Sequence, residues 1–183
     1  MRSYRQAQIA LALSTATEQE RSWQGKVPEA NDERHIPWLP FPIPEFVALT
    51  ALAAAEADGP RFLEIGCGIG TKMLLAQAIF QLDVTGFDRV PEFVEQACGN
   101  GLNAVRADAA TWDGYGEFDI VWFNRPLREA AAEAALETRV WELTAPGTVV
   151  MCANLEARPP SSWYLIEDDW EARRGVWQKL PVS

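Results

Sequence analysis

The chain has 183 residues, of which 48% are hydrophobic and 23% charged, values that fit one globular domain and exclude a disordered or fibrous protein. Acidic residues outnumber basic ones by 26 to 16, so the net charge is −10 and the pI is near 4.6. This sign opposes a phosphate backbone, and nucleic acid is therefore a disfavoured partner.

The first helix is expected at residues 4–22, before a connector at 36–44 whose four prolines exclude a helix or a central strand. After the connector, expected helices and strands alternate along the chain. Helices are expected at 44–52, 71–80, 91–99 and 126–143, and strands at 61–65, 82–87, 104–106, 118–123 and 148–153. Two strand-like runs, 163–166 and 176–180, predict a terminal hairpin.

This alternation, with continuously apolar strands, predicts an α/β fold: a single domain with a doubly wound, mostly parallel sheet and helices on both faces. The terminal hairpin is expected to add one antiparallel strand. In such folds ligands bind beyond the carboxyl ends of the strands, where the strand order reverses.

The three cysteines, Cys67, Cys98 and Cys152, are widely spaced, and the single histidine is His35. We therefore expect neither a disulfide nor a zinc site, and a reducing, cytoplasmic location. The apolar run at residues 9–13 is too short for a signal-peptide core or a membrane span, which predicts a soluble protein without membrane contact.

The turn after the first expected strand has the sequence Glu-Ile-Gly-Cys-Gly-Ile-Gly, starting at Glu64. Its glycines, Gly66, Gly68 and Gly70, allow a sharp turn and a close approach of a ligand to the backbone. The third glycine comes one residue too early for the dinucleotide fingerprint, and Glu64 would repel a diphosphate. A carboxylate here suits a cationic ligand, an ammonium or a sulfonium. A tight turn without any ligand is the alternative.

Acidic residues also follow the next two strands. Asp88, 18 residues past Gly70, can accept hydrogen bonds from both hydroxyls of a ribose, or it can be the N-cap of the helix that opens at Pro91. Asp108 is placed to meet an adenine edge, or it belongs to a turn that caps a short helix.

With these residues in this order, the chain resembles the class I (Rossmann-like) S-adenosylmethionine-dependent methyltransferases over roughly residues 46–180. The resemblance implies S-adenosylmethionine as cofactor, S-adenosylhomocysteine as product, and no metal. It implies that the glycine turn carries the methionine part, that Asp88 holds the ribose, and that Asp108 binds the adenine amine, with Arg89 and Val90 beside the adenine face. The cofactor residues it assigns are Glu64, Gly66, Cys67, Gly68, Gly70, Asp88, Arg89, Asp108 and Ala109.

Two departures from the family bear on the acceptor. After the fourth strand, nucleic-acid and protein-amide methyltransferases carry Asn/Asp-Pro-Pro-aromatic, whereas this chain has Asn124-Arg125-Pro126-Leu127. The missing aromatic ring disfavours a planar adenine or amide acceptor, although Asn124 can still hydrogen-bond a nucleophile. At residues 154–162 we expect a loop where the family has a helix.

Residues 1–44 are expected to form an arm that acts as a lid over the acceptor pocket, and residues 45–183 the cofactor-binding domain. The candidate catalytic residues are Asn124 and, as a general base, His35, for which an exposed or packed arm histidine is the alternative. The arm could instead contact a partner or a second copy through aromatic residues (Trp38, Phe41 and Phe46).

The acidic balance favours a small-molecule acceptor. A protein or nucleic-acid methyltransferase with a basic patch at Arg125 and Arg128 is one alternative, and a cofactor-binding scaffold without catalysis is another. The sequence leaves the oligomeric state open.

Overall fold

The structure, a computed structural model, describes residues 2–24, 26, 36 and 39–181. The helices are α1 (Arg2–Trp23), α2 (Ile43–Glu56), α3 (Thr71–Phe80), α4 (Pro91–Gly99) and α5 (Ala130–Leu143), with a 3-10 turn at Gly114–Glu117. The strands are β1 (Arg61–Ile65), β2 (Asp83–Asp88), β3 (Asn103–Arg106), β4 (Ile120–Asn124), β5 (Val149–Ala153), β6 (Trp163–Asp169) and β7 (Arg174–Lys179).

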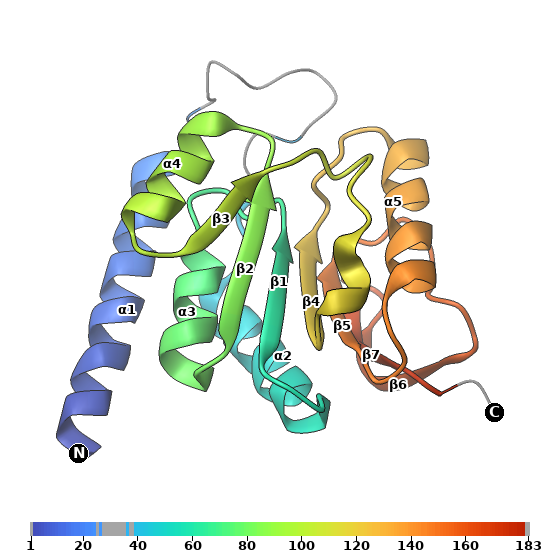
Figure 1. Cartoon of the computed structure of the whole chain (residues 1–183), viewed down its shortest axis with the longest axis horizontal. Coiled ribbons are helices and arrows are strands. Elements are labelled where there is room, and N and C mark those ends of the chain that lie inside the picture. Colours follow the sequence, from blue (N-terminus) through green and yellow to red (C-terminus); the bar gives the residue numbers. More distant parts are fainter. Residues whose placement is uncertain (1, 25, 27–35, 37–38, 182–183) are drawn as a thin grey trace.

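The seven strands form one sheet in the order β3-β2-β1-β4-β5-β7-β6 (Figure 1). Strands β1 to β5 are parallel, β7 runs antiparallel to β5, and β6 runs antiparallel to β7. The predicted fold class is confirmed. The hairpin adds two strands to the sheet, not one, because β7 pairs with β5 and β6 pairs with the far side of β7.

Helices cover both faces of the sheet, α5 on one side and α2 and α3 on the other, with α1 outside α3 (Figure 1). Strand β4 illustrates why, since its side chains alternate between the two faces. Ile120 and Trp122 belong to the core under α2 and α3, whereas Val121 and Phe123 belong to the core under α5. A strand buried on both sides is apolar throughout, which is the pattern that the sequence shows.

Helix α5 begins at Ala130, so the expected start at residue 126 was wrong. Arg125 has a left-handed backbone with φ 45°, and the Leu127 N–H donates to the Glu133 carboxylate at 2.9 Å. The Leu127 amide is therefore bonded to a side chain and does not belong to the backbone hydrogen bonds of a helix. Glu129 has an extended backbone, and the helix starts after it. The segment 154–162 forms a loop, as expected.

Helix α1 is attached to the domain near both of its ends. The Arg5 guanidinium donates to the Ile79 carbonyl at 3.3 Å, and the Trp23 indole N–H donates to the Gln96 side chain at 3.0 Å. The Trp23 ring also meets Phe93 edge-on, with ring centroids 4.9 Å apart. The N-terminal helix is therefore an integral layer of the structure.

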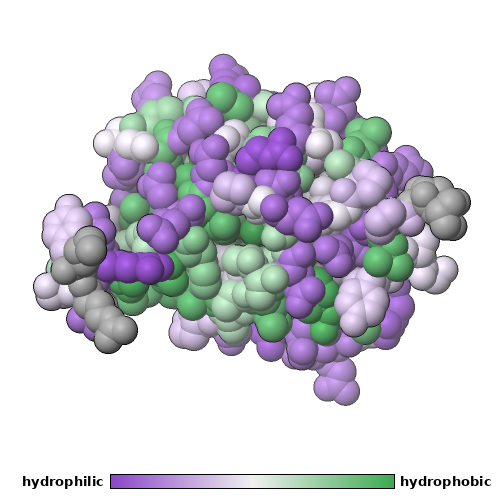
Figure 2. All heavy atoms as spheres, turned by 60° about the horizontal axis from the view of Figure 1, so that its bottom comes forward, coloured by the Kyte–Doolittle hydropathy of each residue, from purple (hydrophilic) through white to green (hydrophobic). Residues whose placement is uncertain are grey.

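Hydrophobic residues are interspersed with hydrophilic ones on the face that Figure 2 shows. Within the described part of the chain, no helix combines the length and the apolar character that a membrane crossing requires.

Candidate active site

Strands β1, β2 and β4 end at the same edge of the sheet (Figure 1), and the strand order reverses between β1 and β4. A pocket lies at these strand ends. Its cavity volume is about 100 Å³, and it opens to solvent. Four parts of the chain contribute most of its wall: the glycine turn after β1, the end of β2, the end of β4, and the N-terminal arm. This is where ligands bind in open α/β sheets.

The glycine turn joins β1 to α3, and two of its glycines are required for different structural reasons. Gly66 lies in the pocket wall with φ 69°, and a Cβ there would stand 3.1 Å from the Cβ of Pro126. Gly70 has φ 81°, and a Cβ there would stand 2.4 Å from the Leu102 side chain. The missing side chain at Gly66 thus leaves the backbone accessible from the pocket. The missing side chain at Gly70 allows the start of α3 to pack closely against Leu102.

The Glu64 carboxyl lies in the pocket wall, and the residue is only 5% exposed. Its Oε2 accepts a hydrogen bond from the Met73 N–H at 3.2 Å. Burial raises the pKa of Glu64 to about 8, while the Lys72 ammonium acts in the lowering direction. The group is therefore held protonated near pH 7, and a cationic ligand would favour its ionised form.

Lys72 also lies in the wall, buried at the start of α3, and forms an ion pair with Glu20 of α1. Its ammonium is 6.0 Å from the centroid of the Phe46 ring. The pair brings α1 into the pocket wall, since Glu20 itself is part of the lining. A buried ammonium needs such a partner, because leaving it unpaired costs several kcal/mol.

Asp88 stands at the end of β2 with its carboxylate toward the glycine turn. Its Oδ2 accepts from the Gly68 N–H at 2.8 Å, and its Oδ1 accepts from the Val90 N–H at 2.9 Å. The N-cap of α4 is Val90, so the alternative role of Asp88 as that cap was wrong. The carboxylate instead fixes the end of β2 against the glycine turn.

Asp108 follows β3 and closes a turn. Its Oδ1 accepts from the Ala110 N–H at 2.9 Å, and its carbonyl accepts from the amides of Thr111 and Trp112. Among the described residues, neither Asp108 nor Gly70 belongs to the pocket lining. The other predicted cofactor residues do: Glu64, Gly66, Cys67, Gly68, Asp88, Arg89 and Ala109.

Asn124 lies in the pocket wall at the end of β4, and both ends of its amide are bonded within the protein. Its Nδ2 donates to the Leu39 carbonyl at 3.0 Å, and its Oδ1 accepts from the Asn154 amide at 2.6 Å. Asn124 therefore ties the arm to the end of the sheet. His35, the other predicted catalytic residue, lies outside the described residues, as does Trp38.

Two buried glutamates on α5 support the loops beside this end of the pocket. Glu133 accepts from the Leu127 N–H, and Glu137 accepts from the Glu156 and Ala157 N–H groups at 2.7 and 3.1 Å. Burial raises the pKa of Glu133 to about 8, and its Oε1 has no hydrogen-bond partner among the described residues. One helix thus holds the loops that follow β4 and β5.

Several wall residues were missed from the sequence. Glu20, Ile36 and Leu39 reach the pocket from an arm far away along the chain, and no local pattern marks them. Lys72 did carry a signal, since it is the second residue after the glycine turn. In the described part of the chain, no three His, Cys, Asp or Glu side chains gather as a metal site would require.

The strand order, the glycine turn after β1 and the acidic residue after β2 together define the class I S-adenosylmethionine-dependent methyltransferase fold. The resemblance that the sequence indicates is confirmed by proteins of known activity. Trans-aconitate 2-methyltransferase of Methylobacterium radiotolerans is 34% identical to the chain over 107 residues. The matched part is 56% of this chain and 41% of that enzyme, so the chain matches less than half of its relative's length.

Solved structures show the same fold. An amino pentose methyltransferase from Micromonospora echinaspora, with bound S-adenosylmethionine, matches 65% of this chain and 58% of its own at 23% identity and a TM-score of 0.52. An RNA methyltransferase from Salinibacter ruber, in complex with S-adenosylhomocysteine, has a TM-score of 0.60 and 18% identity. The match covers 79% of this chain and 95% of that protein. No family model matches the sequence.

Proposed function

We propose that this chain is a cytoplasmic S-adenosylmethionine-dependent methyltransferase that acts on a small molecule. The observation that carries the proposal is the meeting of Glu64, Asp88 and the glycine turn in one pocket at the reversal of strand order. The similarity to the trans-aconitate enzyme supports it. The three cysteines, all free, support a reducing compartment.

The residues present fit the cofactor. The buried Glu64 carboxyl would ionise beside a cation, and the glycine turn leaves backbone exposed where a side chain would fill the space. Asp88 is the group that would hold the ribose, and Arg89 and Ala109 would lie beside the adenine. Asp108 itself is absent from the lining, whereas its neighbours Ala107 and Ala109 belong to it, so Asp108 is proposed to meet the adenine amine from the edge of the pocket.

When bound, S-adenosylmethionine supplies a methyl carbon attached to a positively charged sulfur. Glu64 and the glycine turn would hold its methionine part and Asp88 its ribose, so that the methyl group could be transferred to an N, O or S atom of the acceptor. Because charge is neutralised in this transfer, the protein's contribution is mainly to orient the reactants and to exclude water.

Residues 1–44 are proposed as the lid over this reaction. Glu20, Ile36 and Leu39 already line the pocket, and the Ile36 N–H donates to the Pro126 carbonyl at 3.3 Å. A lid of this kind keeps water from the reacting centre and completes the acceptor site.

Cofactor binding is tested by thermal unfolding with added S-adenosylmethionine. At 100 times its dissociation constant the ligand adds about 2.7 kcal/mol of stability, which raises the melting temperature by roughly 5–10 °C for a chain of this size. An unchanged melting temperature at millimolar S-adenosylmethionine would contradict the proposal that the chain binds this cofactor.

Turnover of methyl-labelled cofactor is then followed against metabolite, RNA and protein pools, with trans-aconitate as the first single compound. Methyl label in small molecules would support the proposal. Methyl label in RNA or protein would contradict the small-molecule acceptor and identify the acceptor class instead. Binding without any turnover identifies a scaffold that has lost catalysis.

Asp88→Ala is expected to weaken the binding of S-adenosylmethionine and S-adenosylhomocysteine alike. Both share the ribose, and a hydrogen bond to a charged group contributes about 1.5–3 kcal/mol, so the dissociation constants should rise roughly ten- to hundredfold. Titration calorimetry measures both. Asp83→Ala, at the exposed start of the same strand, is the matched control, and equal affinities for the two variants would show that Asp88 does not hold the ribose.

A further inference from the structure

The pocket wall carries two kinds of side chain, which adjoin where Glu64 of β1 pairs with Trp122 of β4 in the sheet. At the ends of β1 and β2 its wall carries the carboxyl groups of Glu64 and Asp88. At the end of β4 the wall is made largely of apolar side chains, contributed by the arm and by the strand: Ile36, Leu39, Pro40, Phe41, Trp122 and Pro126. We call this second part the β4 chamber.

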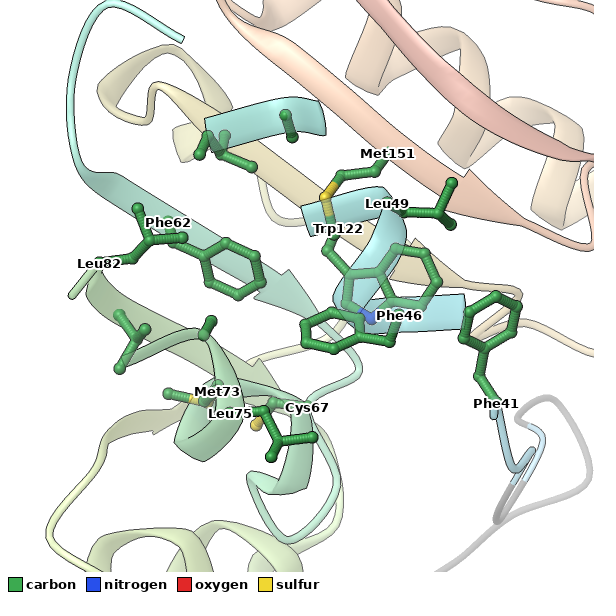
Figure 3. Close-up of a cluster of buried hydrophobic side chains, with 14 of the residues drawn as sticks. Phe41, Phe46, Leu49, Phe62, Cys67, Met73, Leu75, Leu82, Trp122 and Met151 are labelled. Atoms are coloured by element: carbon green, nitrogen blue, oxygen red, sulfur yellow. The ribbon is translucent and has the colours of Figure 1, made fainter. Parts of the chain in front are cut away.

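Three aromatic rings pack in a row at the β4 chamber, two of them in its wall and the third behind them. The Phe41 ring of the arm packs on Trp122 of β4, with centroids 5.0 Å apart, and Trp122 in turn packs on Phe46 of α2 at 5.4 Å (Figure 3). Phe41 and Trp122 are 7% and 1% exposed. Leu39 is 38% exposed, so it offers apolar surface at the chamber without belonging to the core.

The described polar side chains around the β4 chamber are already bonded to other parts of the protein. Asn124 uses both ends of its amide, on the Leu39 carbonyl and on the Asn154 side chain. The Arg125 guanidinium pairs with Glu156, and the Lys72 ammonium pairs with Glu20. An acceptor bearing several charges would have to break one of these pairs, and a buried charge that loses its partner costs several kcal/mol.

We propose that the methyl acceptor has an apolar body, carries a single N, O or S nucleophile, and seats that body in the β4 chamber against Leu39 and Trp122. This deepens the proposed function and rests on it. In this arrangement Asn124 is a positioning residue, which holds the arm over the chamber through the Leu39 carbonyl. A compact polyanion finds no unpaired cation among the described wall residues at this end, whereas an apolar body gains free energy from burial.

Ligand-detected NMR on the full chain, saturated with S-adenosylhomocysteine, tests the proposal with two probes. Indole represents an apolar body and trans-aconitate represents a polyanion. We expect indole to bind with a dissociation constant at least tenfold lower than that of trans-aconitate. Equal affinities, tighter binding of trans-aconitate, or no binding of indole would overturn the proposal.

Leu39→Asp places a charge in the β4 chamber and leaves the backbone carbonyl that Asn124 requires. Leu52→Asp is the matched control, because Leu52 is also 38% exposed but lies on α2, outside the lining. We expect Leu39→Asp to weaken indole binding at least fivefold and Leu52→Asp to leave it unchanged. Equal effects of the two variants would contradict the location of the site.

The dissociation constant of S-adenosylhomocysteine is measured in the same samples. If the unaltered chain does not bind it, the proposed function fails. If the chain binds it but prefers trans-aconitate to indole, only the acceptor class fails.

Discussion

Glu64→Gln is expected to weaken S-adenosylmethionine binding roughly ten- to hundredfold at pH 8, the loss of a charged interaction of about 1.5–3 kcal/mol. In the unaltered chain, burial raises the pKa of Glu64 to about 8, so at pH 6 the carboxyl is protonated. A cation favours the ionised form, and its binding releases that proton. Affinity should therefore rise by up to about tenfold per pH unit between pH 6 and 8, whereas the glutamine variant should show no such rise.

Titration calorimetry at pH 6, 7 and 8 measures this dependence, with Glu56→Gln at the exposed end of α2 as control. Equal losses for S-adenosylmethionine and S-adenosylhomocysteine would place the ammonium beside Glu64, whereas a larger loss for S-adenosylmethionine would place the sulfonium there. A pH profile that the substitution leaves intact would exclude Glu64 as the titrating group. Because the glutamine amide oxygen can still accept from the Met73 N–H, unfolding is not the expected cause of a loss.

Glu133→Gln is expected to stabilise the chain at pH 8 and to change little at pH 5. Burial raises the pKa of Glu133 from 4.5 to about 8, so protonation favours the folded state. As the pH rises from 4.5 to 8, the unfolded chain ionises this group while the folded chain keeps it protonated, and stability falls by up to about 1.4 kcal/mol per unit. Glutamine removes this loss and still accepts from the Leu127 N–H, so we expect a gain of about 2–4 kcal/mol at pH 8.

Urea unfolding at pH 5 and pH 8 measures the difference, and Glu129→Gln, exposed at the start of the same helix, is the control. A variant whose stability relative to the unaltered chain is the same at both pH values would contradict a raised pKa at Glu133. The loop after β4 should keep its structure in the variant, since the hydrogen bond to Leu127 remains.

The features that were predicted from the sequence depend on short-range patterns. The continuous apolar run of β5 indicates a strand buried on both faces, and the glycine turn precedes Asp88 in the order of the chain, so their meeting follows from parallel strands alone. Asp108 shows the limit of this reasoning. A turn and a ligand site favour the same short acidic residue at the same place, so the sequence predicts both roles; the structure shows the turn through the hydrogen bond to Ala110.

Contacts between distant segments were not predictable. Glu20 and Lys72 are 52 positions apart, and neither belongs to a pattern that identifies the other. The start of α5 was wrong for a related reason. Glu133 and Glu137 are charged residues on the buried face of an Ala-rich helix, opposite to the usual amphipathic arrangement, and Glu133 takes the Leu127 amide away from the helix.

The attachment of α1 also affects the order in which the chain acquires its structure. The bonds of α1 to Ile79, Lys72 and Gln96 join positions 74, 52 and 73 residues apart. During synthesis α1 therefore has no docking surface until α3 and α4 have followed it. The β1–α3–β2 unit, built from near neighbours along the chain, has the lower closure entropy and assembles ahead of it. Helix α1 therefore adds Glu20 to the wall of the pocket only after α3 and α4 have formed.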